Sequence, residues 1–408
     1  MLVLVINCGS SSVKYHLIET EETAEGETLC KGMIERIGAV TSIVKHEPVG
    51  KRHIKDSKVI SDHNEAMQEI MSYLLDEKNE LVSDEVKIEA VGHRVVHGGE
   101  MFKDSVLIDN DVLEAIEEAF DLAPLHNPPN LKGIEAAKKH LPDLPHVAVF
   151  DTAFHQTLPR RAYLYGIPNR LYRRYKIRRY GFHGTSHYYV SRQYYKITDL
   201  PKEETRVISC HLGNGASVTA IDGGRSVDTS MGFTPLAGLV MGTRSGDIDP
   251  SILFYLVEKE ELSLNSLHAL LNRHSGLLGV SGYASDMRDL ISEAHNGDRR
   301  CQQAIDLFCY RVKQYIGSYY AVLNGCDAIL FTAGIGENSP LVRKKSLENL
   351  DGLGIELDDK KNESVTPGMV EKISSDNSRA DVYIVPTNEE LVIAIDTAKI
   401  ARATRHSP

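Results

Sequence analysis

Apolar runs and polar turns begin the chain. Residues 2–6 are all apolar, which predicts a buried strand. Residues 7–12 are rich in Ser and Gly and predict a turn, and apolar and polar side chains alternate over residues 13–18. Because a period of two marks a half-buried strand, this segment predicts a β-hairpin.

A similar pattern occurs half a chain later. The apolar pair at 207–208 leads into a glycine-rich turn at 211–215, and residues 216–221 predict a second strand before the turn at 222–224. Ser12 and Ser217 then occupy matching places, separated by almost half of the 408 residues. The pattern fits either an internal duplication or two unrelated hairpins.

Helical patterns alternate with short strands along the rest of the chain. Residues 61–75 predict a helix with Asp62 as its N-cap and Glu65 as the N3 partner, residues 111–120 predict a second, and Asn127 is expected to cap a third. Further strands are predicted at residues 146–150, 328–332 and 382–385. This alternation predicts an α/β protein, in which polar loops after strands are the usual ligand sites.

Composition narrows the class of protein. Apolar residues make up 42% and charged residues 25%, the balance of a globular chain, and the net charge is −11. Such a chain is a poor general binder of nucleic acid, which requires clustered positive charge. One basic run interleaved with tyrosines, at residues 170–180, fits either a minor RNA-contacting patch or, more simply, a solvated face beside an anionic ligand.

The cysteines and apolar runs indicate a compartment. The six cysteines form no C-x-x-C pair and no metal-like spacing with histidine, which is typical of reduced thiols. No apolar run approaches the ~20 residues of a membrane span, and the N-terminal run lacks the basic flank of a signal peptide. We therefore expect a cytoplasmic protein.

Three glycine-rich segments are candidate phosphate sites, at residues 7–12, 211–215 and 334–338. Backbone N–H groups in such turns can face phosphate oxygens, although a single turn of this kind is more often a plain β-turn. None is a Walker A loop, because Lys14 has neither the preceding glycine pattern nor a following Ser or Thr. The third has Ser339 where a dinucleotide fingerprint needs glycine.

Longer motifs carry a family resemblance. They are NCGSSSVKY (7–15), GHRVVHGG (92–99), APLHNPPN (123–130), VFDTAFHQT (149–157), YGFHGTSH (180–187), HLGNGAS (211–217), DTSMGFTPLAGLVMGTRSGDIDP (228–250), FTAGIGENS (331–339) and PTNEE (386–390). From end to end, the chain resembles the acetate kinase (acetokinase) family.

The resemblance implies a fold and an activity. The fold would be a duplicated, ribonuclease-H-like α/β fold of the sugar-kinase, actin and heat-shock ATPase type, with two domains and a central cleft. The expected domains are residues 1–153 with 387–408, and a nucleotide-binding domain at 154–386. The activity would be transfer of the ATP γ-phosphoryl to acetate by direct in-line displacement, with Mg²⁺ or Mn²⁺, in a homodimer.

The resemblance assigns three catalytic residues: Asp151, His183 and Arg244. Glycines on both sides of Arg244 let the backbone approach a ligand, and a guanidinium suits the charge on a transferring phosphoryl. Alone, Asp151 fits equally well as an N-cap. Because acetate is already ionised at pH 7, we expect Asp151 to orient an arginine or a metal-bound water rather than to act as a base.

Binding residues follow from the same motifs. Arg94 would hold the acetate carboxylate in its planar fork. An apolar wall would surround the methyl group, formed by Val96, Leu125, Phe182 and Pro235. ATP or ADP would contact Lys14, His211, Leu212, Gly213, Asn214, Gly215, Asp286, Met287, Arg288, Gly334, Ile335, Gly336, Glu337 and Asn338. The metal-associated positions would be Asn7 and Glu389.

Several of these residues have structural alternatives. Lys14 fits a solvated strand face, Asp286 fits an N-cap with Asp289 in the first turn, and Glu390 fits a capping box begun by Thr387. Cys8 departs from the family's usual Ser or Ala, and its place in a turn rich in N–H groups predicts an accessible, reactive thiol.

The alternatives for function are a propionate or other short-chain fatty acid kinase, and an actin- or heat-shock-type ATPase without a carboxylate substrate. One methylene changes binding by only ~1–3 kcal/mol, so the apolar wall does not exclude propionate. The motifs at 92–99 and 149–157 have no evident use in a filament protein. Acetate kinase activity is therefore the favoured hypothesis.

Overall fold

The computed structural model describes residues 1–21, 25–76, 81–82 and 87–405. The chain divides into two compact units, which are described separately. Unit 1 is Met1–Ala153 with Asn388–Pro408, and unit 2 is Phe154–Thr387. Among the described residues, no helix is long and apolar enough to cross a membrane.

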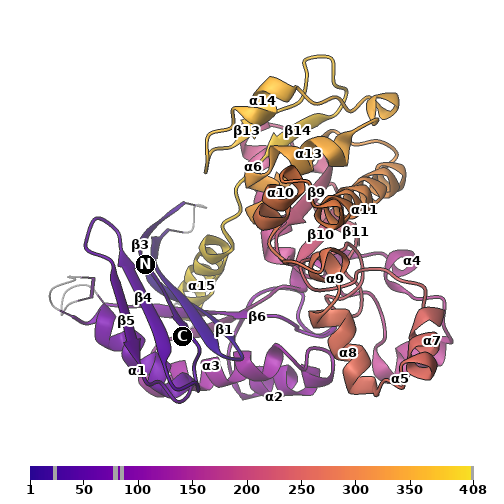
Figure 1. Cartoon of the computed structure of the whole chain (residues 1–408). Coiled ribbons are helices and arrows are strands. Elements are labelled where there is room, and N and C mark those ends of the chain that lie inside the picture. Colours follow the sequence, from indigo (N-terminus) through magenta and orange to yellow (C-terminus); the bar gives the residue numbers. More distant parts are fainter. Residues whose placement is uncertain (22–24, 77–80, 83–86, 406–408) are drawn as a thin grey trace. The chain divides into compact units, whose positions relative to one another are not determined.

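Unit 1 is built on a mixed sheet with the strand order β5-β4-β3-β2-β1-β6-β8-β7 (Figure 1). β1 is antiparallel to β2 and parallel to β6, so the predicted hairpin and buried N-terminal strand are confirmed. The strands are β1 (Leu2–Gly9), β2 (Ser12–Thr20), β3 (Gly26–Glu35), β4 (Ser42–Pro48), β5 (Ile54–Lys58), β6 (Ala90–Val95), β7 (Val106–Leu107) and β8 (His146–Phe150).

Helices cover both faces of this sheet. α15 (Glu389–Arg405) packs on β1, β6 and β8 from one side, and α1 (His63–Leu74) and α3 (Asn127–His140) lie on the other (Figure 1). α2 (Asn110–Glu118) and the short 3-10 helix η1 (Ala119–Asp121) precede α3. Alternate residues of β1 and β2 point into the core, among them Leu4, Ile6 and Tyr15, which are all buried.

The ends of two helices in unit 1 test the sequence signals. Asp62 caps α1 as predicted, because its carboxylate accepts the Glu65 N–H at 2.9 Å. The predicted cap role of Asn127 is wrong: His126 holds the N-cap position of α3. The Asn127 side chain is buried and accepts the His97 N–H at 3.1 Å while donating to the His97 carbonyl at 2.9 Å, so it fixes the chain after β6 instead.

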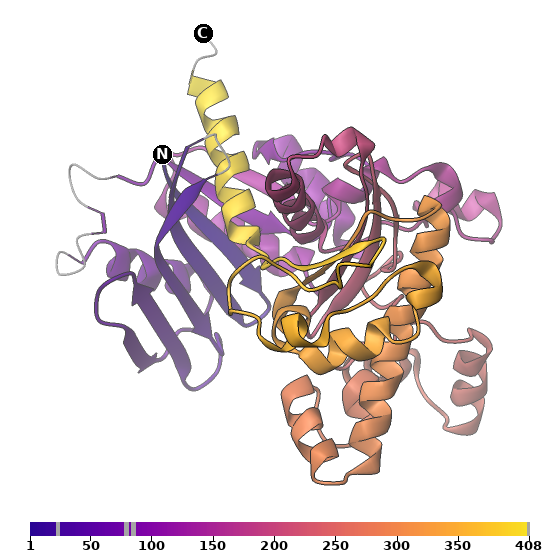
Figure 2. The ribbon, with the colours of Figure 1, turned by 90° about the horizontal axis from the view of Figure 1, so that it is seen from above.

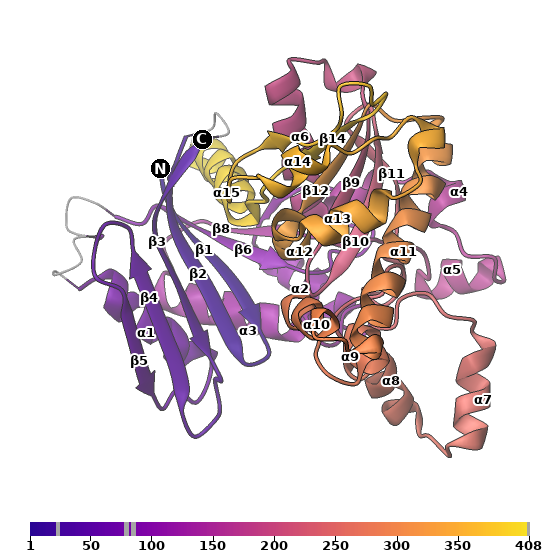
Figure 3. The same cartoon turned by 45° about the horizontal axis from the view of Figure 1, so that its top comes forward.

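Unit 2 repeats the arrangement of unit 1. Its sheet order is β11-β10-β9-β12-β14-β13, in which β9 is antiparallel to β10 and parallel to β12 (Figure 3). The strands are β9 (Arg206–Leu212), β10 (Ala216–Asp222), β11 (Arg225–Thr229), β12 (Ala328–Thr332), β13 (Glu371–Lys372) and β14 (Asp381–Ile384). Since β3-β2-β1-β6-β8 and β11-β10-β9-β12-β14 have the same order and directions, the two hairpins belong to a duplicated fold.

Most helices in the described part of the chain lie in unit 2. α6 packs on one face of the sheet and α11 with α13 on the other (Figure 2). The helices are α4 (Arg160–Tyr163), α5 (Asn169–Tyr175), α6 (Gly184–Thr198), α7 (Ser251–Lys259), α8 (Leu264–Arg273), α9 (Gly276–Ser281), α10 (Met287–His295), α11 (Arg299–Leu323), α12 (Ala333–Asn338), α13 (Pro340–Leu347) and α14 (Asp359–Glu363). Short 3-10 helices are η2 (Ala153–Thr157), η3 (Lys202–Glu204) and η4 (Asp351–Leu353).

The third predicted glycine-rich turn is a helix. Residues 334–338 lie in α12, which starts directly after β12. Ala333 takes the left-handed conformation with φ 64°, which turns the chain sharply from strand to helix. The Glu337 carboxylate then accepts the Ala333 N–H at 2.8 Å, so the helix satisfies part of its own N-terminus.

Candidate active site

Arg94 and Asp151 form the centre of a charged cluster in unit 1. They lie at the ends of the parallel neighbours β6 and β8, whose carboxyl ends share one edge of the sheet. Arg94 Nε donates to Asp151 Oδ1 at 3.0 Å and Nη2 donates to Oδ2 at 2.6 Å, which is a two-pronged ion pair. The Asp151 side chain is 3% exposed. Asp151 therefore orients an arginine, and the N-cap alternative for it is wrong.

Three more polar residues surround this ion pair. Arg94 Nη1 donates to Asn7 Oδ1 at 3.5 Å, and Asn7 faces Lys14 across the β1–β2 ladder. Glu389 begins α15, and burial raises its pKa to about 7, with Asp151 adding to this rise against the lowering effect of Arg94. Burial alone would lower the pKa of Arg94, but Asp151 and Glu389 reverse this and raise it. Arg94 and Asp151 thus act on the Glu389 carboxyl in opposite directions, and burial makes the net change a rise in its pKa.

This donor set is of the kind that magnesium uses. Carboxylate and amide oxygens are hard ligands, and Mg²⁺ usually takes only one or two carboxylates, with water and phosphate completing its shell. Among the described residues, no three His, Cys, Asp or Glu side chains gather in the manner of an all-protein metal site. Asn7 and Glu389 supply an amide and a carboxylate oxygen, which are ligand types that Mg²⁺ accepts.

The turn after β6 is held by asparagines that the sequence reading missed as site residues. Val96 N–H donates to Asn130 Oδ1 at 3.0 Å, and Asn130 Nδ2 donates to the Cys8 carbonyl at 2.7 Å. Together with Asn127, this amide fixes the segment that carries Arg94. Leu125, in the turn before α3, is 44% exposed and free to contact a ligand. The signal available in the sequence is the spacing of Asn127 and Asn130, three residues apart at the start of a predicted helix.

In unit 2, Arg244 and His183 meet at Gly215. A Cβ placed on Gly215 would lie 2.8 Å from Arg244 Nη2 and 3.3 Å from His183 Nε2, so only glycine leaves room for both. Arg244 Nη1 donates to the Pro235 carbonyl at 2.7 Å, and no carboxylate pairs with the guanidinium within the described part of the chain. Burial lowers the pKa of Arg244. A half-buried cation without a carboxylate partner in the described structure is suited to bind an anion.

His183 is held in place from two sides. It takes the left-handed conformation, with φ 56°, immediately before α6. Its Nδ1 lies 2.9 Å from Ser217 Oγ, and its ring stacks on that of His211 with 4.1 Å between centroids. His211 Nδ1 in turn lies 2.8 Å from Ser186 Oγ. Phe182, which precedes His183 in the chain, is buried. The Phe182 carbonyl lies 2.9 Å from His155 Nε2.

The β9–β10 turn docks on the segment that carries Arg244. Gly242 N–H donates to the Asn214 carbonyl at 2.9 Å, and the Asn214 amide oxygen occupies the space that a Cβ on Gly242 would need. The N–H of Gly213 is used inside the turn, on the Gly215 carbonyl at 3.1 Å. The structure thus brings together Gly213, Asn214, Gly215, His183, His211 and Arg244, with Leu212 buried beneath them at the end of β9.

Comparison with known proteins decides the family. A model described as the Acetokinase family matches residues 2–395. An acetate kinase of Thermotoga maritima is 55% identical over 402 residues, which cover 98% of each chain. The chain belongs to the acetokinase family. Membership makes it a kinase, and it excludes an actin-type or heat-shock-type ATPase.

Solved structures of the acetokinase family share the whole fold. The acetate kinase of Porphyromonas gingivalis matches with a TM-score of 0.92 at 45% identity, over 98% of this chain and 99% of that chain. A propionate kinase of Francisella tularensis matches with a TM-score of 0.90 at 43% identity, over 98% and 99% of the two chains. The predicted duplicated α/β fold is confirmed.

Two predicted nucleotide segments of this acetokinase use their side chains internally. Asp286 caps α10, accepting the Arg288 N–H at 2.9 Å, and its carboxylate also pairs with the exposed Arg288 guanidinium, while Met287 is buried. Asn338 Nδ2 donates to the Gly334 carbonyl at 2.9 Å. A side chain on Gly334 would meet nothing within 4 Å, whereas Gly336 is buried and Ile335 half-buried, so the open part of α12 is its first turn.

The predicted capping box of α15 is wrong. Asn388 caps the helix, because its Oδ1 accepts the Leu391 N–H at 3.0 Å. Thr387 instead donates its N–H to Glu337 Oε1 at 3.2 Å, and its hydroxyl lies 2.8 Å from Ser186 Oγ. No hydrogen bond ties Glu390 to the helix start among the described residues.

The prediction of a reactive Cys8 is also wrong. The side chain is buried beneath α3, and a Cβ placed on Gly133 would lie only 2.2 Å from Cys8 Sγ. Burial raises the pKa of the thiol to about 12. The turn predicted an exposed sulfur, but Cys8 is the last inward-facing residue of β1 and points into the core.

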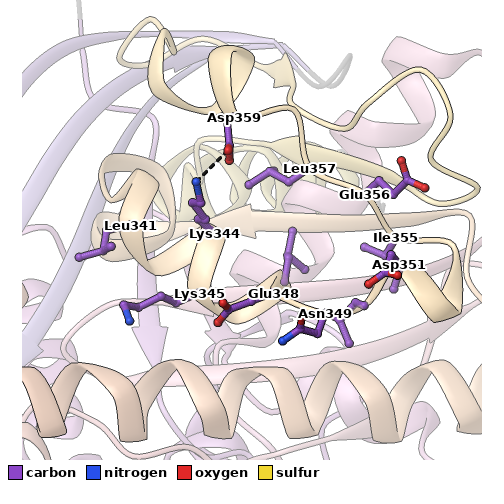
Figure 4. Close-up of a pocket in the computed structure, with 12 residues that line it drawn as sticks. Leu341, Lys344, Lys345, Glu348, Asn349, Asp351, Ile355, Glu356, Leu357 and Asp359 are labelled. Atoms are coloured by element: carbon purple, nitrogen blue, oxygen red, sulfur yellow. Dashed lines mark hydrogen bonds and ion pairs between the residues drawn. The ribbon is translucent and has the colours of Figure 1, made fainter.

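Two features lie outside the candidate site. In the basic run, Arg178 stacks on Tyr163 at 3.8 Å and Arg179 Nη1 donates to the Ser230 carbonyl at 3.1 Å, so two of its cations are structural. A cavity of about 480 Å³ lies between α13 and η4 (Figure 4). Its lining includes Lys344, paired with Asp359, and none of the predicted site residues.

Proposed function

We propose that this member of the acetokinase family transfers the γ-phosphoryl of ATP to acetate, reversibly, giving acetyl phosphate and ADP. The observation that carries the proposal is the Arg244 guanidinium, which is half-buried, lies beside His183 at Gly215, and has no carboxylate partner among the described residues. In a phosphoryl transfer that needs only positioning and charge stabilisation, such a group matches the equatorial oxygens of the moving phosphoryl.

The bond changes balance without a base. A carboxylate oxygen of acetate attacks the γ-phosphorus, and the bond to the β–γ bridging oxygen breaks as ADP leaves with its electron pair. Since acetate is ionised near neutral pH, no proton has to be removed. Asp151 then serves to hold Arg94 in the orientation in which a remaining N–H meets the acetate carboxylate.

The two units take different parts in the proposal. Unit 1 would bind acetate through Arg94, with Val96 and Leu125 near the methyl group, and would supply Lys14 to a phosphate. Unit 2 would be the nucleotide-binding domain, through the 211–215 turn, the 286–288 segment and the open first turn of α12, with Phe182 and Pro235 completing the apolar wall. Asn7 and Glu389 would hold Mg²⁺, in part through water, and the ion when bound would neutralise phosphate charge.

Acetate is proposed as the substrate ahead of propionate. The test measures ADP release together with hydroxylamine trapping of the acyl phosphate, first with acetate and then with propionate. A higher kcat/KM for acetate, and no activity after EDTA until Mg²⁺ or Mn²⁺ is restored, are the expected results. A higher kcat/KM for propionate would reverse the substrate, and absence of any carboxylate-dependent ADP release would overturn the proposal.

We also propose a homodimer in the cytoplasm. α7 and the start of α8 expose large apolar side chains, with Phe254 77% and Leu264 79% exposed, and an apolar helix of this kind fits a second copy of the same surface. All six cysteines are buried free thiols, as suits a reducing compartment. Light scattering should give twice the chain mass, and Phe254→Asp should give the monomer.

A further inference from the structure

A line of buried hydrogen bonds runs from His183 into the interior of unit 2. His183 Nδ1 lies 2.9 Å from Ser217 Oγ, and Ser217 Oγ lies 2.8 Å from His187 Nε2. His187 Nδ1 lies 2.8 Å from Ser209 Oγ, which ends the line. His187 comes from α6, Ser209 from β9 and Ser217 from β10, and these three side chains are fully buried.

The protons of this line have one arrangement that satisfies every group. Burial lowers the pKa of His187 well below its ordinary value, and His155 and His211 lower it further, so the ring is neutral and has a single N–H. Ser209 Oγ has no second partner among the described residues. If His187 Nδ1 carried the hydrogen, the Ser209 hydroxyl hydrogen would be buried without an acceptor, which costs roughly 1–3 kcal/mol.

The satisfied arrangement therefore runs in one direction. Ser209 O–H donates to His187 Nδ1, His187 Nε2–H donates to Ser217, and Ser217 O–H donates to His183 Nδ1. His183 Nδ1 is then an acceptor without a hydrogen, so the ring hydrogen of His183 is on Nε2. This nitrogen is the one that faces Gly215 beside Arg244 Nη2.

We infer that Ser209, His187 and Ser217 are positioning residues that fix His183 as its Nε2–H tautomer. This inference rests on the proposed phosphoryl transfer for its purpose: an Nε2–H next to a guanidinium donates to phosphoryl oxygen, whereas an Nε2 lone pair would repel it. The stack on His211 holds the plane of the ring, and the serine line decides which nitrogen carries the hydrogen.

The direct test reads the tautomer without reference to activity. Nitrogen-15 spectra of protein labelled at histidine, assigned with His183→Gln, should show His183 with a protonated Nε2 and an unprotonated Nδ1 at pH 7.5. A His183 signal with Nδ1 protonated, alone or together with Nε2, would overturn the inference. Because this result does not depend on turnover, it stays separate from failure of the proposed function, which would appear as wild-type protein without acetate-dependent ADP release.

Variants then connect the tautomer to the rate. Ser217→Ala should lower kcat about tenfold or more, towards the 10²–10³-fold loss of a transition-state donor, with the KM values for acetate and ATP within about twofold. Ser209→Ala should change both tautomer and kcat in the same direction but less, and Ser217→Thr, which keeps the hydroxyl, should restore both. The matched control is Ser191→Ala, a buried serine of α6 that bonds the Tyr188 carbonyl outside the line.

Two results would show a merely structural role and overturn the inference. One is a Ser217→Ala variant with wild-type kcat and tautomer. The other is a variant in which kcat and melting temperature fall together, the KM values rise, and the His183 tautomer stays as in the wild type.

Discussion

At the scale of the residue, the two arginines of the candidate site differ in their partners. Arg94 is paired with Asp151 by two hydrogen bonds, and its charge is already balanced. Among the described residues, the Arg244 guanidinium donates to the Pro235 carbonyl and pairs with no carboxylate, so its charge is left for a ligand. The surroundings are consistent with different roles for the two arginines, in which Arg94 would hold the acetate carboxylate in both the ground and the transition state and Arg244 would pair with charge that develops on the phosphoryl.

This division predicts different kinetic losses. Arg94→Ala should chiefly raise the KM for acetate, whereas Arg244→Ala should lower kcat by ~10³-fold or more. Arg244→Lys should recover part of the rate, because a point charge does not reproduce the planar fork, and added guanidinium ion should rescue Arg244→Ala. Steady-state kinetics with circular dichroism as the folding control make the test. Wild-type kcat in Arg244→Ala would exclude its transition-state role.

Cys8 gives a second prediction at this scale, opposite to the one from sequence. Because the thiol is buried under α3 and its pKa is raised to about 12, it should not react with a thiol reagent in the native protein at pH 8. Titration with a coloured disulfide reagent should find no fast-reacting thiol, and all six after unfolding. Rapid modification of Cys8, located by mass spectrometry, would show that β1 opens in solution.

At the scale of the element, α12 is held by the fully buried Arg343. Its guanidinium donates to the Gly336 and Glu337 carbonyls at 2.9 Å each, to Asn362 Oδ1 at 2.7 Å and to the Asn362 carbonyl at 2.9 Å. Burial lowers its pKa to about 10. This cation sits at the carboxyl end of α12, where the helix dipole favours it.

Removing this cation should cost several hydrogen bonds at once. Arg343→Met leaves four buried acceptors without a donor and should lower the free energy of unfolding by ~3–5 kcal/mol, measured by urea denaturation. The control is Lys344→Met, whose ammonium pairs with Asp359 at the surface and should change stability by less than ~1 kcal/mol. Equal loss in both variants would mean that Arg343 does not support α12.

Neighbouring residues at the start of α15 have different expected roles, one in metal binding and one in capping the helix. Glu389→Gln should raise the Mg²⁺ concentration needed for half-maximal rate, while Asn388→Ala should cost ~1 kcal/mol of stability through the lost cap. Glu390→Gln, without a bond to the helix start in the described structure, is the matched control for both and should change neither. A magnesium requirement altered equally by Glu389→Gln and Glu390→Gln would contradict the assignment.

At the scale of the whole molecule, buried neutral histidines couple stability to pH. Burial lowers the pKa of His155 to about 4, and it lowers those of His93, His187 and His146 as well. His155 Nδ1 lies 2.8 Å from Ser226 Oγ, and its other nitrogen is held by the Phe182 carbonyl, so the neutral ring is well bonded. These rings therefore stay neutral in the folded protein at pH values where the same histidines are protonated in the unfolded chain.

The direction of the pH dependence of stability follows from the protonation of these histidines in the folded and unfolded chains. Unfolded histidines bind protons below pH ~6.5 and the folded His155 does not until about pH 4, so stability is full above pH 6.5 and falls as the pH drops through this range. His155 alone should contribute roughly 3 kcal/mol of this loss. Urea denaturation at pH 7.5, 6.0 and 5.0 should show the decline, and His155→Gln should flatten it. Constant stability over this range would show that the buried rings are protonated in the folded protein as readily as in the unfolded chain.

The local pattern of the sequence is sufficient to predict several strands and a helix cap. Alternation and apolar runs predicted β1, β2 and the strand ending at Asp151, because side-chain direction in a strand depends only on sequence position. Asp62 was a readable cap, since a cap needs a partner only three residues away. The long motifs are sufficient to indicate the acetokinase family.

Tertiary packing decided what depends on distant partners. Only the structure shows that Cys8 faces Gly133, that Asn127 holds His97 instead of capping α3, and that Arg343 binds the carbonyls of α12. The line from His183 through Ser217 to His187 joins a helix to two strands. No sequence spacing encodes such contacts, because the hydrogen bonds and burial of a side chain are set by which elements the folded chain brings against it.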